Sequence, residues 1–172
     1  MCSYQYAPRL AWHETLELHE LVAMQTNHLI TLKMNVRKIS DPTLRQIYMM
    51  AIQACQQHIR QLLPFYPYAA TVGEHSHQHH AHHDHDHDQS EKGYYAGNLL
   101  AMEKTSVRST AAAITETTTP MLRQVLTGQL MDAIHLHATI FNYMYQQGMY
   151  PSHDLNRLLS NDLRNARRAL AV

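Results

Sequence analysis

The residues best suited to binding a ligand lie in a histidine-rich stretch near the middle of this 172-residue chain. Eight of its fifteen histidines fall within residues 75–87, interleaved with aspartates. These eight are His75, His77, His79, His80, His82, His83, His85 and His87. Neutral imidazole is a good ligand for zinc, copper and nickel, and carboxylates add oxygen ligands. The stretch therefore predicts binding of divalent transition metals with little selectivity. As a biological role, we favour a disordered insertion with no assigned role over metal buffering or pH-responsive charging.

A second set of candidate ligands falls on the apolar stripes of predicted helices. These residues are His28, His58, Glu103 and His137, with Cys55 beside them. At about 1.5 Å of rise per residue, all of them lie at a similar height in a helical bundle. They predict either a site for one transition metal (zinc, nickel, copper or iron) or a group of buried polar residues that hydrogen-bond one another. We favour the second interpretation, in which Glu103 needs a partner and His137 is the first candidate.

The same helices do not predict a di-iron centre, which needs Glu-x-x-His on two helices. The nearest match, Asp132 with His135, points away from the apolar stripe of its helix. The inward histidines, His58 and His137, are preceded at that spacing by a cysteine and an isoleucine. Glu14 also leans inward, but at one end of the bundle, where we expect water to reach it.

The elements that carry these residues are helices. Apolar residues recur at steps of three and four over residues 10–39, 43–63 and 96–150, the last stretch being split at Thr119 and Pro120. Asp41 and Thr119 are suited to helix N-caps, and each is followed by a proline, which is tolerated at a first helical position. Two tight turns therefore predict two antiparallel hairpins. Residues 66–93 form a long His-rich connector between them, and residues 154–171 predict a shorter amphipathic helix.

A connector of this length suits a crossover that runs along the bundle. We therefore predict an all-α, ferritin-like four-helix bundle, two antiparallel hairpins joined by a crossover, with a short C-terminal helix. Residues 1–172 are expected to form a single domain, since the length suits one core and nothing in the sequence predicts strands.

The composition excludes several classes of function. The formal net charge is zero and the basic residues are scattered, so nucleic-acid binding has little electrostatic support. No apolar run approaches the roughly 18–20 residues that span a bilayer, and no secretory signal precedes the first helix. The two cysteines do not make a disulfide framework. Phosphate-binding loops, dinucleotide fingerprints and nucleophile elbows are also missing from the sequence, so we expect neither an enzyme nor a cofactor.

Three stretches of the sequence resemble the coat F family of bacterial spore coat proteins. They read HETLELHELVAMQTNHLITLK, AITETTTPMLRQVLTGQLMDAIHLHATIFNYM and QQGMYPSHDL. The likeness covers both predicted hairpins, roughly residues 10–65 and 95–156, and leaves out the histidine-rich stretch.

This resemblance implies a ferritin-like fold and a structural role in the endospore coat, with no catalytic residues to carry over. It also implies other coat proteins as partners and synthesis in the mother-cell cytoplasm. We expect a homo-oligomer, in the simplest case a dimer. The alternative function is a transition-metal-binding or redox protein that uses the bundle interior, the histidine-rich stretch, or both.

Overall fold

The computed structural model describes residues 9–69 and 89–154, together with residues 156, 161 and 170. Four long helices are present: α1 (Trp12–Asn35), α2 (Pro42–Leu62), α3 (Gln89–Glu116) and α4 (Pro120–Gln146). A short 3-10 helix, η1 (Leu63–Tyr68), follows α2 directly. The described residues contain no strand, which confirms the all-α prediction. None of these helices has the length and apolar character needed to cross a membrane.

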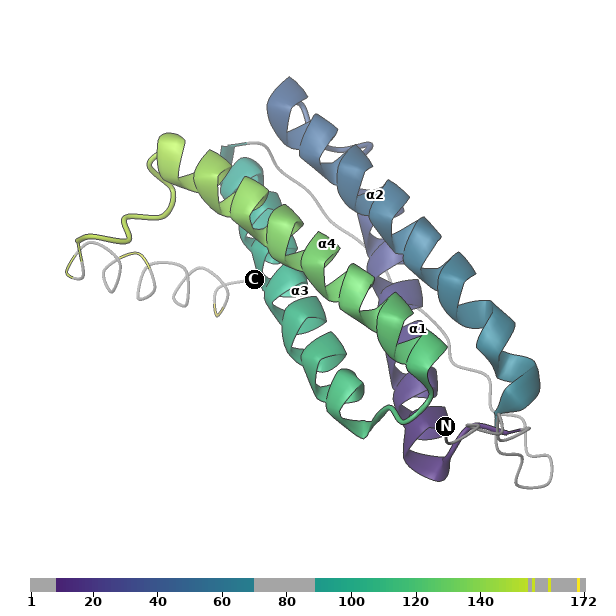
Figure 1. The fold of residues 1–172 in the computed structure, drawn as a ribbon. Coiled ribbons are helices and arrows are strands. Elements are labelled where there is room, and N and C mark those ends of the chain that lie inside the picture. The colour runs from purple at the N-terminus through teal and green to yellow at the C-terminus, as the bar shows by residue number, and fades with distance from the viewer. Residues whose placement is uncertain (1–8, 70–88, 155, 157–160, 162–169, 171–172) are drawn as a thin grey trace.

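The four helices pack as a bundle of two antiparallel hairpins (Figure 1). Helix α1 packs against α2, and α3 packs against α4. Between the hairpins, α1 lies beside α3 and α2 lies beside α4. Every helix thus buries one face against two neighbours, as its stripe of apolar residues requires.

Three contacts fix which ends of the helices lie together. At one end, the Leu10 amide donates to the Tyr68 carbonyl at 2.6 Å, so α1 begins where α2 and η1 finish. The turn between α3 and α4 lies at this same end, because the Thr118 amide donates to Glu14. At the other end, Lys92 near the start of α3 pairs with Asp41 in the α1–α2 turn at 2.6 Å. The chain between α2 and α3 therefore has to cover the length of the bundle.

The predicted limits of this connector were wrong at both ends. The chain is helical through Tyr68 and is helical again from Gln89, whereas a loop was expected over residues 66–93. Helix α2 ends at Leu62, and Pro64 lies in the first turn of η1, where its missing N–H costs nothing. Helix α3 starts early because the Lys92 ammonium pairs with Asp41 and lies 5.7 Å from the Tyr143 ring centroid. The eight histidines of residues 75–87 lie outside the described residues.

The predicted C-terminal helix also lies almost wholly outside the described residues. Only four of its positions are described, and two of them, Asn156 and Asn161, are helical.

Helices α2 and α4 begin with similar local structure. The Asp41 side chain caps α2 by accepting from the Leu44 amide, as predicted, whereas the Thr119 side chain makes no such cap bond to α4. Their first residues read DPTLRQ and TPMLRQ, and each proline takes the first helical position. The Arg45 guanidinium donates to the Ile39 carbonyl at 2.6 and 3.0 Å, and Arg123 donates in the same way to the Thr117 carbonyl. In each hairpin the arginine therefore ties the first turn of the second helix to the end of the turn before it.

Glu14 joins the two hairpins at the end of the bundle, contrary to the expectation that water would reach it. Its side chain is 1% exposed. One carboxylate oxygen accepts from the amides of Thr118 and Thr119, and the other accepts from the Ala11 amide and the Thr119 hydroxyl. Burial alone would raise the pKa of this carboxyl, but these hydrogen bonds lower it below its ordinary value. The ionised Glu14 thus satisfies the free amides at the starts of both α1 and α4.

Two apolar clusters fill the bundle, one toward each end. One contains Leu32, Tyr48, Leu99 and Ile140 among its members. The other contains Leu18, Leu21, Leu62 and Leu126. A layer of polar side chains lies between the clusters, and it includes most of the interior residues that the sequence singled out.

Candidate functional site

The polar layer surrounds a small, partly enclosed cavity between all four helices. Its volume is about 20 Å³, room for roughly one water molecule. The polar residues that line it are Gln25 from α1, Cys55 and His58 from α2, Glu103, Ser106 and Thr110 from α3, and Gln129 and Asp132 from α4. At this level a polar residue interrupts the apolar stripe of each helix.

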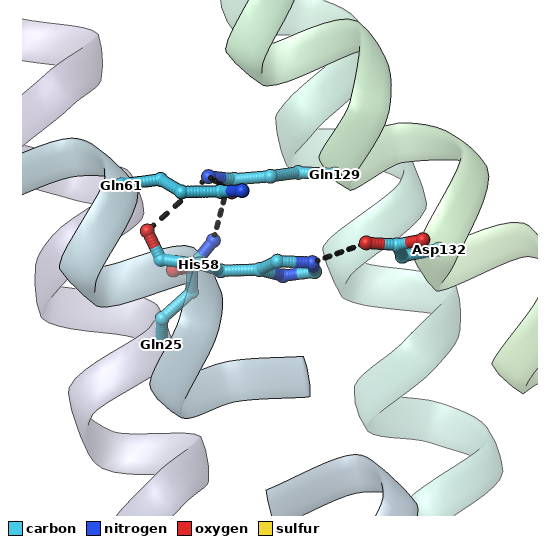
Figure 2. Close-up of polar contacts among 5 residues, drawn as sticks. All are labelled: Gln25, His58, Gln61, Gln129 and Asp132. Carbon is cyan, nitrogen blue, oxygen red and sulfur yellow. Dashed lines mark hydrogen bonds and ion pairs between the residues drawn. The ribbon is translucent and has the colours of Figure 1, made fainter. Parts of the chain in front are cut away.

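A chain of glutamine hydrogen bonds crosses the layer (Figure 2). The Gln25 side-chain amide donates to the Gln129 side-chain oxygen at 3.1 Å. The Gln129 amide group in turn donates to the His58 carbonyl and to the Gln61 side-chain oxygen, both at 3.2 Å. Gln129 therefore links α4 to both α1 and α2, which makes it the central residue of the layer.

Asp132 completes the layer on the side of α2. Its Oδ2 lies 3.0 Å from Nε2 of His58, and Figure 2 shows the imidazole pointing at the carboxylate. The Asp132 side chain is 53% exposed, whereas that of His58 is 9% exposed. The exposure of Asp132 agrees with its predicted position away from the apolar stripe, but its contact with His58 was not predicted. The residue lies at the edge of the buried face, and its side chain reaches back to His58.

Glu103 lies in this layer without a hydrogen-bond partner among the described residues. The residue is 6% exposed, and the structure gives its carboxyl group no hydrogen bond from any described residue. Burial raises the pKa of Glu103 to about 7. The side-chain oxygen of Gln25, which lines the same cavity, is also buried and unpaired among the described residues. Two hydrogen-bond acceptors thus line a space of about one water molecule.

Cys55 is held in its thiol form. Burial and the nearby charge of Glu103 together raise the pKa of Cys55 to about 12. The thiolate is the form that attacks electrophiles and binds metals, so a thiol with this pKa is unreactive at neutral pH. Cys55 therefore acts as a small apolar residue of the core.

The structure brings together only some of the interior residues that the sequence predicted. His58 and Glu103 line the cavity, and both are buried. His28 is only half-buried and lies next to the cavity, where its Nδ1 is 3.5 Å from the Ser106 hydroxyl. Burial lowers the pKa of His28, so the neutral imidazole is favoured.

The predicted pairing of Glu103 with His137 was wrong, because no described contact joins them. His137 is half-buried at the edge of α4, and its pKa is lowered by burial and by the charge of Lys104. No group of three histidine, cysteine, aspartate or glutamate side chains within the described ranges is arranged to hold a metal ion. What the layer can do chemically is exchange one proton at Glu103 and bind a water molecule.

The two central glutamines were not predicted from the sequence. Gln25 and Gln129 are 4% and 1% exposed, yet neither was singled out in the sequence analysis. Their positions hold the available signal. Gln25 lies four residues after Leu21, and Gln129 lies three residues after Leu126, so both continue a buried stripe.

Comparisons with known proteins point to the spore coat. The Coat F domain family matches residues 89–153, a range that contains α3, α4 and the turn between them. Spore coat protein F-like protein YraD of Bacillus subtilis is 32% identical to this chain over 77 residues. That alignment covers 45% of this chain and 78% of YraD. No solved structure matches the chain.

Proposed function

Because the chain belongs to the coat F family, we propose that it is a structural, non-catalytic component of the bacterial spore coat. Family membership is the observation that carries this proposal, and the spore coat is the location that it assigns. The chemistry of the polar layer supports a structural role. Cys55 is protonated, Gln129 joins three helices, and Glu103 has no described basic partner.

We also propose that the bundle is ferritin-like and that residues 1–172 form one domain. The contacts at the two ends of the bundle support this arrangement, because α2 finishes and α3 begins at opposite ends. The polar layer lies where ferritin-like proteins place a metal site. Here glutamine amides link the helices in that layer, so its role is to fix how the helices pack.

The outer surface of the bundle makes the functional contacts, which are with other coat proteins and with a second copy of the chain. Large apolar and aromatic residues are exposed at the end of the bundle where α1 begins and η1 finishes. They are Trp12, Leu16, Leu63, Tyr66 and Tyr68. Exposed aromatic residues of this kind are enriched in protein–protein interfaces.

A comparison of interior and surface variants tests this function. Tagged chains are produced in a sporulating host, and the amount retained by purified spores is measured. Glu103→Gln with Cys55→Ala changes the chemistry of the interior, and Trp12→Ser with Tyr68→Ser changes the surface. We expect the interior variant to be retained like the parent chain and the surface variant to be retained several-fold less. A structural role would be contradicted if the interior variant folds correctly but is lost from the spores while the surface variant is retained.

The histidine-rich stretch supports a second activity, and we propose that residues 75–87 bind divalent transition metals. Eight imidazoles within thirteen residues carry this proposal. Calorimetric titration of protein purified without a metal column, with zinc, nickel or copper, tests it. The control replaces residues 75–87 by a glycine–serine linker of equal length. Metal binding that persists in the control would instead favour the interior set of His28, His58, Glu103 and His137.

A further inference from the structure

The outer face of α4 carries an uninterrupted apolar stripe that no described element covers. Its residues follow one another at alternating steps of three and four: Met131, Ile134, Ala138, Phe141 and Tyr145. Met131, Ile134 and Tyr145 are 47%, 41% and 49% exposed. Ala138 is exposed and Phe141 is half-buried. Since this helix already buries its opposite face in the bundle, the stripe is a second apolar face that needs its own cover.

The chain that leaves α4 stays close to one end of this stripe. Helix α4 ends at Gln146, and Gly148 follows with a φ of 66°, which allows the amides of Gly148 and Met149 to donate back to the carbonyls of Tyr145 and Met144. The Tyr150 ring then packs edge-on against Phe141, with ring centroids 5.5 Å apart.

The chain next turns, because the Asp154 amide donates to the Pro151 carbonyl. The His153 ring packs edge-on against Tyr145, with ring centroids 6.1 Å apart. The last continuously described residues thus lie beside the Tyr145 end of the stripe.

The segment that follows matches the stripe in length and pattern. Residues 155–169 and the stretch from Met131 to Tyr145 each contain fifteen residues. A helix of that length extends about 21 Å. Leu159, Leu163 and Ala166 recur at steps of four and three, the same spacing as in the stripe. Helices with apolar residues at this spacing pack side by side along their seams.

We propose that residues 155–169 dock as an antiparallel helix on the outer stripe of α4. The start of the segment then faces Tyr145, and its end faces Met131. In this register Ala166 faces Ile134. Leu170 falls one residue beyond the end of the stripe. The docked segment makes a fifth helix of the folded body, and this inference does not depend on the location of the protein in the coat.

Limited proteolysis of the full-length chain tests the docking, because the segment carries its own trypsin sites at Arg164, Arg167 and Arg168. Ile134→Glu places a charge in the middle of the stripe. We expect it to speed cleavage at these arginines by about tenfold or more, because cleavage follows the undocked population. Met49→Glu is the matched control, since Met49 is 45% exposed on α2, away from the stripe. Circular dichroism confirms that both variants keep the helical bundle. Equal cleavage of the parent chain and both variants would overturn the proposal.

A disulfide test fixes the register. In a Cys2→Ser background, Ile134→Cys with Ala166→Cys should form an intramolecular disulfide on mild oxidation, because docking brings the two Cα atoms into bonding range. Met49→Cys with Ala166→Cys should not. A different outcome would show that a second copy of the chain occupies the stripe. In that case the Ile134→Cys, Ala166→Cys variant forms a disulfide-linked dimer. Light scattering then finds the parent chain dimeric and the Ile134→Glu variant monomeric. That result would overturn docking within one chain.

Discussion

Replacing Glu103 with glutamine should change how the stability of the protein depends on pH. Glutamine keeps the size and shape of the side chain but cannot ionise. In the parent chain, burial raises the pKa of Glu103 from 4.5 to about 7. The folded state therefore binds more protons than the unfolded state between these two values. The stability of the parent chain falls as pH rises through this window, and the loss is complete above the folded pKa.

The size of the effect follows from the same two pKa values. A carboxyl whose pKa rises from 4.5 to about 7 on folding costs about 3 kcal/mol when it is fully ionised. About 1 kcal/mol of this falls between pH 6 and pH 8. For a chain of this length, 1 kcal/mol corresponds to roughly 2–4 °C in melting temperature. Relative to the Glu103→Gln variant, the parent chain should therefore lose about this much between pH 6 and pH 8.

Urea unfolding, followed by circular dichroism at several pH values, measures this difference. Subtracting the two curves removes the titration of the histidines, because both proteins share them. Glu20→Gln, on the exposed face of α1, is the control and should run parallel to the parent chain. A difference between parent and Glu103→Gln that stays constant from pH 6 to pH 8 would refute the reasoning. It would mean that Glu103 has a charge partner or reaches water.

Three further substitutions test the contacts that organise the bundle, each by urea unfolding. Glu14→Gln should cost about 2–3 kcal/mol at pH 7, because buried amides lose a charged acceptor, while Glu116→Gln on the surface should cost little. Because the folded pKa of Glu14 is lowered, this cost should shrink as pH falls through the carboxyl range, and a constant cost would contradict the assignment. Gln129→Met should cost about 1–3 kcal/mol by leaving Gln25 without its acceptor, and a neutral result would show that the layer repacks. Arg123→Lys should cost about 1 kcal/mol through loss of the forked contact to the Thr117 carbonyl, and equal stability would mean that a single ammonium suffices.

The helices and their pairing could be predicted because they follow from local rules. The spacing of apolar residues identifies the buried face of each helix, and prolines at the first helical positions, Pro42 and Pro120, mark two tight turns. The length of the connector indicated that the chain crosses the bundle. The limits of that connector could not be predicted, since the early start of α3 depends on the contact of Lys92 with Asp41 across the fold.

The polar layer could be predicted only in part, because pairing between helices decides which polar residues are buried. His58 and Glu103 stood out as titratable residues on apolar stripes. Gln25 and Gln129 are buried because each supplies the hydrogen bond that the other needs, and no single helix shows this. Asp132 was predicted to point away from the apolar stripe, and it is exposed, but helix geometry alone does not show that its side chain reaches His58. Glu14 was misjudged because its partners, the amides of Thr118 and Thr119, are more than one hundred residues away.

Fractionation of purified spores tests the central claim, a structural role in the spore coat, most directly. Detergent and reducing agent extract the coat layers, and an antibody against this chain then locates it in the coat extract or in the stripped spore. The account predicts that nearly all of the chain appears in the coat extract. Recovery of the chain in the stripped spore, or in the soluble fraction of the mother cell with none in the coat, would contradict it.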